Sequence, residues 1–271
     1  MTEILTDLSP SSLAVAIKAN LYAYFYDLRH AANATVRESA DGFRWLTGIP
    51  IPWFNGLLSI REPSGNVAQL IEETLAFFRS NRIAGFTWWL APHLQPDAWA
   101  EQLLPRGFQY DDHTPGMAVH LDALPPLAPH PLITRQVTDR QALAEWARIL
   151  TRGFEMPENL APQICELFDV PETAVPARHY LGFLDDRPVA TASLLLAAGV
   201  AGIYNVATVA EARHQGIGSV MTLIPLLAAR EMGYHTGILQ SSEMGYAVYQ
   251  RLGFKKLTQV DYFQWRDPDP A

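Results

Sequence analysis

Short apolar runs alternate with amphipathic segments along the second half of the chain. The runs Tyr180 to Leu184, Val189 to Ala197 and Val200 to Val209 predict three consecutive antiparallel strands. A tight turn at Asp185-Asp186-Arg187 joins the first two. Another strand is predicted upstream, at Ile133 to Val137. This part of the chain is therefore expected to form a sheet from strands that follow one another in sequence.

Two helices follow these strands. Ser219 to Met232 predicts a helix with a buried apolar stripe, and Glu243 to Leu252 predicts a second helix after a short strand at His235 to Gln240. Pro225 lies inside the first helix, where it removes a hydrogen bond to the carbonyl of Met221. We expect one bent helix there. The stripe consists of Ile217, Val220, Met221, Ile224, Leu227 and Ala228.

The first half of the chain shows a similar order of elements. A strand, a helix, a strand, a helix and a Gly-Phe pair follow one another in both halves, over 53 positions from Asn55 to Phe108 and 49 from Asn205 to Phe254. We interpret this as a degenerate internal repeat. The alternative is an unrelated α+β domain with the same element order by coincidence. The predicted elements are a helix at 13–32, a strand at 53–60, a helix at 67–81, a strand at 85–90 and a helix at 96–104.

A proline-rich segment separates the two halves. Residues 122–131 contain Pro125, Pro126, Pro129 and Pro131, which favour an extended segment without a helix. The predicted domains are residues 1–124 and 132–271, joined by a linker at 125–131. A helix is predicted in the second domain from Asp139, as N-cap, to Leu150.

Composition narrows the class of protein. The 271 residues are enough for two domains, and 20 basic against 28 acidic residues give a net charge of −8, which indicates no nucleic-acid surface. The lone Cys165 cannot form an internal disulfide. Glu3 and Asp7 stand where a signal peptide would be positive, and no stretch reaches membrane-spanning length. We expect a soluble cytoplasmic protein, a monomer or homodimer, without a membrane partner.

The segment Arg213-His214-Gln215-Gly216-Ile217-Gly218 connects a predicted strand to a predicted helix. Its glycines allow close approach of a ligand, and the free amides of the first helical turn favour an anion. A Walker loop would need a Lys followed by Ser or Thr after the last Gly, and the dinucleotide-binding fingerprint would need a third Gly. A phosphorylated ligand of another kind is expected.

This RxxGxG pattern resembles the acyl-coenzyme A pyrophosphate loop of the GNAT acetyltransferase superfamily. Tyr249 lies four residues before Gly253-Phe254, as in the closing helix of that family, and the resemblance covers residues 131–266. It implies an α+β fold with a mixed central sheet flanked by helices, present as a tandem GNAT-like fold if the repeat is real. It also implies acetyl-CoA as cosubstrate and a small-molecule amine as acceptor.

The resemblance also implies roles for individual residues. Tyr249 corresponds to the general acid that protonates the departing thiolate, although Tyr246 lies one turn earlier and a buried structural tyrosine is the alternative. Ser242 stands where the family often has Asn near the pantetheine. Arg213 either contacts phosphate or is a surface cation. The implied cofactor-binding residues are Ala207, Thr208, Val209, Arg213, His214, Gln215, Gly216, Ile217, Gly218, Ser219 and Ser242, with the strand residues acting through their backbone.

The matching segment of the first half departs from this pattern. Residues 61–66 contain one glycine, an acidic residue and Pro63, and Leu103 stands at the position of the tyrosine. We therefore expect the first half to bind no coenzyme A and to act as a scaffold or substrate wall.

The general base and the acceptor stay open. The strand 203–209 offers only Tyr204, Asn205 and Thr208, and Cys165 is expected to pack rather than react. The expected activity is N-acetylation of a small amine, with a non-catalytic coenzyme A sensor or a protein N-acetyltransferase as alternatives. The remaining candidates for the base are Glu155, Glu158, Glu166, Asp169, His179 and Tyr180.

Overall fold

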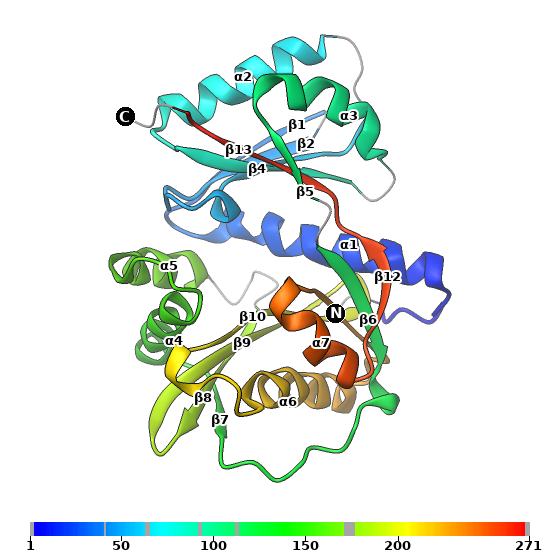
Figure 1. Cartoon of the computed structure of the whole chain (residues 1–271), viewed down its shortest axis with the longest axis vertical. Coiled ribbons are helices and arrows are strands. Elements are labelled where there is room, and N and C mark those ends of the chain that lie inside the picture. The colour runs from blue at the N-terminus through cyan, green and yellow to red at the C-terminus, as the bar shows by residue number, and fades with distance from the viewer. Residues whose placement is uncertain are drawn as a thin grey trace. The chain divides into compact units, whose positions relative to one another are not determined.

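The computed structural model describes residues 3–40, 42–62, 66–91, 94–111, 114–170 and 177–268. It divides into two compact units (Figure 1): unit 1 contains residues 1–32 and 115–258, and unit 2 contains residues 33–114 and 259–271. Each unit has a mixed sheet with helices. The Pro63-Ser64-Gly65 part of the first-half loop lies outside the described residues.

Unit 1 is built on a seven-stranded sheet in the order β12-β6-β11-β10-β9-β8-β7. The three predicted antiparallel strands are confirmed as neighbours, and Asp185 and Asp186 form their turn with φ angles of 49° and 58°. The strands β10 and β11 pair in parallel. The strands are β6 (Pro115–His120), β7 (Ile133–Gln136), β8 (Arg178–Leu184), β9 (Arg187–Ala197), β10 (Val200–Thr208), β11 (Thr236–Gln240) and β12 (Lys255–Gln259).

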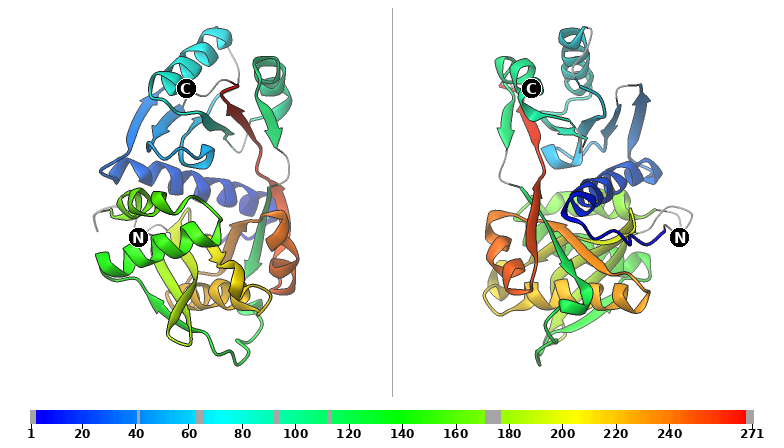
Figure 2. Two further views of the ribbon diagram at one scale, coloured as in Figure 1. Left: turned by 60° about the vertical axis from the view of Figure 1, so that its left-hand side comes forward. Right: turned by 90° about the vertical axis from the view of Figure 1, so that its right-hand side faces the viewer.

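Helices cover both faces of this sheet. A Cβ atom on Gly202 would collide with Asn20 of α1, whereas one on Gly237 would lie 2.7 Å from Leu226 of α6. Because Gly202 and Gly237 occupy adjacent register positions, α1 and α6 lie on opposite faces, as both views in Figure 2 show. The helices of unit 1 are α1 (Pro10–Asp27), α4 (Arg140–Gly153), α5 (Ala161–Phe168), α6 (Ile217–Glu231) and α7 (Glu243–Arg251).

Two sequence signals in unit 1 act as expected. The side chain of Asp139 accepts a hydrogen bond from the amide of Ala142, which confirms it as the N-cap of α4. Pro225 lies within α6, which continues on both sides of it, so the prediction of one helix rather than two is confirmed. No helix in the described part of the chain has the length and apolar character needed to cross a bilayer.

Unit 2 contains a six-stranded sheet in the order β1-β2-β3-β4-β13-β5. Aromatic residues contribute much of its core, including Trp88, Trp99 and Phe86. The predicted strand at 53–60 begins later, because Pro52–Phe54 forms a 3-10 turn before β3. The elements are β1 (Thr35–Ser39), β2 (Gly42–Leu46), β3 (Gly56–Ser59), α2 (Val67–Ser80), β4 (Gly85–Leu90), α3 (Pro96–Leu103), β5 (Gln109–Asp111) and β13 (Tyr262–Arg266).

The two halves of the chain exchange their last strands. β6 ends the first half but lies between β11 and β12 in unit 1, and β13 ends the second half but lies between β4 and β5 in unit 2. Both strands fill the same slot, between the strands that flank the last helix of each half. This reciprocity supports the internal repeat.

The exchange changes the domain boundaries. The compact units divide at 32/33, 114/115 and 258/259 rather than at the linker 125–131, and α1 belongs to unit 1 although it lies in the first half. The reason is that α1 packs against β9, β10 and β6, a choice of partner that its own sequence does not encode.

Candidate functional site

The strands β10 and β11 separate after a short paired stretch. They pair at Ala201 with Gly237 and at Gly202 with Ile238, and within the described residues no further pairing between them follows. β10 then bulges between Tyr204 and Ala207, where Asn205 has a φ of 53°. A bulge bends a strand and leaves backbone groups outside the ladder. The carboxyl end of β10 therefore offers an open strand edge next to β11.

The predicted anion loop leads from this edge into α6. Gly216, with a φ of 78°, is the N-cap of the helix and has no side chain to occupy it. Its carbonyl accepts the amides of Ser219 and Val220, at 3.0 and 3.3 Å. Helix geometry leaves the amides of Ile217 and Gly218 without an internal acceptor, and no described atom lies within 4 Å of a Cβ built on Gly218. This geometry provides an accessible anion site.

The corresponding helix of the first half is closed by its own cap. The side chain of Asn66 accepts a hydrogen bond from the amide of Gln69 at 3.1 Å, and its carbonyl accepts the amide of Leu70. Leu103 is fully buried in the core of unit 2. These contacts give both positions structural roles that differ from those of Gly216 and Tyr249.

His130 holds the anion loop from the proline-rich segment. Its Nδ1 accepts the amide of Leu132 at 3.0 Å, so its hydrogen is on Nε2, which donates to the carbonyl of Gln215 at 2.7 Å. The sequence analysis missed this residue because it is 85 positions away from its partner.

Arg213 bonds to three acceptors within the protein. Its guanidinium donates to the carbonyls of Thr208 and Gly153, at 3.1 and 3.0 Å, and to the carboxylate of Glu155 at 2.7 Å. The predicted phosphate contact of Arg213 stays a prediction, and these bonds add a structural role to it. The side chain joins the end of α4 to the end of β10, and this connection positions the backbone of the anion loop.

We expect the Arg213→Lys variant to lose about 1–3 kcal/mol in the free energy of unfolding without coenzyme A. A single ammonium cannot reach all three acceptors in the planar arrangement of a guanidinium. Urea denaturation measures the effect, with Arg251→Lys, at an exposed position, as control. Unchanged stability together with weaker acetyl-CoA affinity would instead place the guanidinium on phosphate.

The three predicted backbone contacts at the end of β10 and just after it differ in the groups that they offer. The amide of Val209 donates to Val189 and its carbonyl accepts from Ala212, both at 2.9 Å, so its backbone is already used within the protein. This departs from the expected cofactor role of Val209. Ala207 is buried and lies opposite Thr191 of β9. Since successive amides of a strand point to opposite edges, the amide of Thr208 faces away from β9.

Tyr249 lies on α7 with its ring folded toward the start of that helix. A Cβ built on Gly245 would lie 2.7 Å from the ring, and Phe254 packs on it edge to face at 5.9 Å between centroids. Burial raises the pKa of the phenol to about 12. Its hydroxyl has no hydrogen-bond partner among the described residues. The start of α7 follows β11, so the phenol is directed toward the separated strand ends.

Ser242 serves as the N-cap of α7. Its hydroxyl accepts the amide of Gly245 at 3.2 Å, and its side chain is exposed. This capping bond fixes the start of the helix that carries Tyr249, and the expected pantetheine contact of Ser242 stays a prediction.

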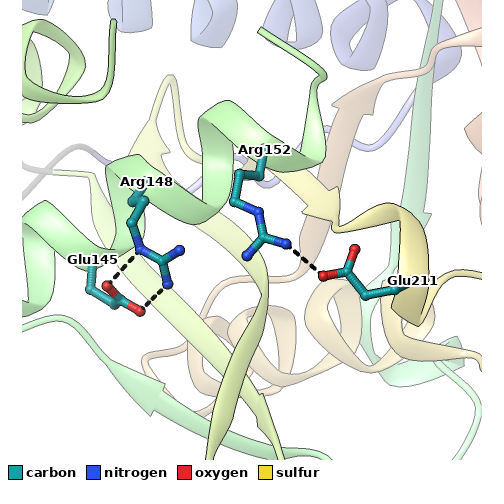
Figure 3. Close-up of polar contacts among 4 residues, drawn as sticks. All are labelled: Glu145, Arg148, Arg152 and Glu211. Carbon is teal, nitrogen blue, oxygen red and sulfur yellow. Dashed lines mark hydrogen bonds and ion pairs between the residues drawn. The ribbon is translucent and has the colours of Figure 1, made fainter. Parts of the chain in front are cut away.

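Ion pairs engage several of the candidate carboxylates. Arg213 pairs with Glu155, and Arg140 pairs with Asp169. Figure 3 shows two further pairs made by arginines of α4, Arg152 with Glu211 at 2.6 Å and Arg148 with Glu145 at 2.6 Å. The carboxylates of Glu155 and Asp169 are therefore already engaged by protein cations.

His179 lies in a buried polar cluster beneath α1. Its Nδ1 is 2.8 Å from the hydroxyl of Ser193, which also accepts the Nδ2 amide of Asn205 at 3.1 Å. Asn205 Nδ2 also lies 3.1 Å from the hydroxyl of Tyr24. Burial lowers the pKa of His179 to about 3, so its ring is neutral at neutral pH and is a weak base.

This lowered pKa predicts a loss of stability in acid. The unfolded chain takes up a proton at His179 below its ordinary pKa of about 6.5, whereas the folded chain does so only near 3. Stability is therefore complete above about 6.5 and declines as the pH falls toward 3, by up to about 1.4 kcal/mol per pH unit. We expect His179→Gln to flatten this part of the stability curve, and His235→Gln, at an exposed position, to leave it unchanged. Parallel curves for the wild type and His179→Gln would contradict the assignment.

Comparison with known proteins identifies the fold of the chain. No protein family model and no curated protein matches the chain. Among solved structures, a GCN5-related N-acetyltransferase from Kribbella flavida is 18% identical, with a TM-score of 0.64 over 93% of this chain and 96% of that one. A conserved protein of unknown function from Staphylococcus epidermidis is 14% identical, with a TM-score of 0.63 over 85% and 93%.

A tandem GNAT protein from the clavulanic acid biosynthesis pathway is 15% identical to the chain, with a TM-score of 0.59 over 97% of this chain and 94% of that one. These likenesses show that the chain has the fold of the GNAT acetyltransferases along its length, in two halves. The predicted α+β class with a mixed sheet in each half is confirmed.

Proposed function

We propose that the chain is an acetyl-CoA-dependent N-acetyltransferase that acts on a small-molecule amine, with its site in unit 1. The observation that carries this proposal is the open edge where β10 and β11 separate, next to the uncapped start of α6. An open strand edge that is followed along the chain by an anion site suits a ligand that has an amide-bearing arm and a pyrophosphate.

The residues present fit coenzyme A. The amides of Ile217 and Gly218 would hold the pyrophosphate, and the space at Gly218 leaves room for it. The amide of Thr208, which faces away from β9, would meet the pantetheine arm. His214 and Gln215 would contribute backbone amides around the same loop, whereas the amide of Ser219 already donates to the carbonyl of Gly216. His130, through Gln215, and Arg213, through Thr208 and Gly153, would keep the loop in position.

Acetyl transfer needs a proton at the sulfur. The amine nitrogen forms a bond to the carbonyl carbon of the thioester, the carbon–sulfur bond breaks, and the electron pair of that bond stays on sulfur. Tyr249 would donate a hydrogen bond to this sulfur. A thiol has a pKa of about 8.5, so a phenol with a pKa of about 12 stabilises the thiolate mainly as a donor rather than by full transfer. The proton of the amine leaves to a base or to water.

The experiment is the release of free thiol from acetyl-CoA with a panel of primary amines, with mass spectrometry of the acetylated product. Amine-dependent thiol release is the expected result. Binding of acetyl-CoA without turnover for any amine would favour a coenzyme A sensor, and absence of binding would refute the proposal. Acetylation of protein lysines but of no small amine would move the acceptor to the class of proteins.

A further inference from the structure

Consecutive backbone amides of the anion loop, those of residues 214–218, have no acceptor within the described residues. The amides of Arg213 and Ser219 bound this run, and both donate to carbonyls of the protein. His214 and Gly216 have positive φ angles, of 63° and 78°. Successive amides in a turn of this kind form a concave anion site. The direction of each peptide plane therefore decides whether an amide or a carbonyl faces the anion.

A side chain distant in sequence holds the peptide between Gln215 and Gly216. The Nε2 of His130 donates to the carbonyl of Gln215 at 2.7 Å, and a Cβ built on Gly216 would lie 3.8 Å from the same nitrogen. The carbonyl and the amide of a trans peptide point in opposite directions. Because the carbonyl of Gln215 is fixed toward His130, the amide of Gly216 is directed away from it. That amide belongs to the free run.

Glycine at position 216 makes this peptide plane easy to turn over. Such a rotation changes ψ of Gln215 and φ of Gly216 together, and glycine accepts φ angles of either sign. A turned plane would bring the carbonyl of Gln215, with its partial negative charge, to the side of the amides, where it would repel a phosphate. The hydrogen bond from His130 stabilises the orientation that favours the anion.

The ring of His130 is itself held by the proline-rich segment, which is the green loop that leads into β7 in Figure 1. Its Nδ1 accepts the amide of Leu132 at 3.0 Å, and Pro131 restricts the backbone of the residue before it to extended conformations. Leu132 is buried, and its side chain lies 3.1 Å from a Cβ built on Gly182 of β8. The segment therefore presents His130 from a restrained backbone that is anchored on the sheet.

We infer that His130 is a positioning residue for coenzyme A, which keeps the amide of Gly216 directed into the pyrophosphate site. The inference rests on the proposed function for the identity of the ligand. His130 acts through the peptide 215–216 rather than on the ligand, since its Nε2 hydrogen is used on Gln215 and its Nδ1 on Leu132. The proline-rich segment thereby serves the cofactor site as well as joining the two halves.

Two substitutions separate the donor from the shape of the ring. His130→Phe keeps a planar ring beside Gly216 and removes the donor, whereas His130→Gln keeps an N–H group at about the position of Nε2. Calorimetry on the full chain measures the binding of acetyl-CoA. We expect His130→Phe to bind it about 10- to 100-fold more weakly, as the loss of one hydrogen bond to a charged group implies, and His130→Gln to stay within about threefold of the wild type. His235→Phe, at an exposed position, is the control and should bind as the wild type does.

Kinetics distinguish positioning from a general structural role. At saturating acetyl-CoA, His130→Phe should keep kcat within about twofold, because the reacting atoms are untouched, while its KM for acetyl-CoA rises. S-acetylpantetheine has no pyrophosphate, so His130→Phe should use it as well as the wild type does. Equal losses with both thioesters would make His130 a residue of general stability and would overturn the inference.

The remaining outcomes separate this inference from the proposed function. Undiminished acetyl-CoA affinity in His130→Phe overturns the inference and leaves the acetyl transfer intact. Affinity that depends on His130, without thiol release for any amine, supports the inference and refutes the acetyltransferase proposal. Failure of the wild type to bind acetyl-CoA refutes both, since both name the same ligand.

Discussion

Replacing Gly218 with Glu should lower the affinity for acetyl-CoA by at least about 100-fold, because a carboxylate would occupy the proposed pyrophosphate site. Gly218 suits this substitution better than Gly216. No described atom lies within 4 Å of a Cβ at Gly218, whereas Gly216 has a φ of 78°, where any side chain is strained. An acidic residue in the first turn also favours the helix, so the folded state should be retained.

Ala68→Glu is the matched control for this variant. Ala68 is the second residue of α2, just as Gly218 is the second residue of α6, and Ala68 is exposed. We assign no cofactor to the first half of the chain, which contains Ala68. Calorimetric titration with acetyl-CoA should show no change for Ala68→Glu. Undiminished affinity in Gly218→Glu with a normal melting temperature would remove the central argument for the loop, and lost affinity in Ala68→Glu would assign a cofactor site to unit 2.

The Tyr249→Phe variant should reduce kcat about 100-fold and leave acetyl-CoA affinity within about twofold. The loss of the hydroxyl removes a donor that is needed only when the thiolate leaves, while the ring still packs on Gly245 and Phe254. Because the pKa of the phenol is about 12, it stays protonated up to that pH. The wild type should therefore show no loss of rate from this group between pH 8 and 10.

Steady-state kinetics at several pH values test the role of Tyr249. Tyr246→Phe, one turn earlier on α7, is the control and should keep its kcat. An unchanged kcat in Tyr249→Phe would make this tyrosine structural. A different result would be a fall of the wild-type rate near pH 10 that Tyr249→Phe does not show. That result would mean that the pKa of the Tyr249 phenol is not raised.

Several features of the fold were predictable because they depend on local sequence. The apolar runs around β8, β9 and β10 and the Asp185-Asp186 turn specify a meander, since neighbouring strands in sequence pair through short turns. Asp139 caps α4 through its own side chain, and Gly216 starts α6 with a positive φ. These are relations between residues a few positions apart.

Other features depend on partners that are distant in sequence. The strands β6 and β13 occupy equivalent slots in the two sheets, and the strands with which they pair are distant in the sequence, so the exchange was not predictable. Arg213 finds Gly153 and Glu155 about 60 residues upstream, and His130 finds Gln215. A basic residue in a loop that resembles a phosphate-binding loop suggests a ligand contact until its acceptors within the protein are known.

The sequence by itself determined the order of the elements, the anion loop at 213–218 and the position of Tyr249 before Gly253-Phe254. Each of these features depends on the spacing of residues within a short stretch of the chain. Only the tertiary structure decided which strands share a sheet, what Arg213 and Val209 bond to, and that His130 holds the peptide between Gln215 and Gly216. Most of those outcomes depend on contacts between segments that are distant in the sequence, where burial and hydrogen-bond satisfaction select the partner and no local pattern encodes it.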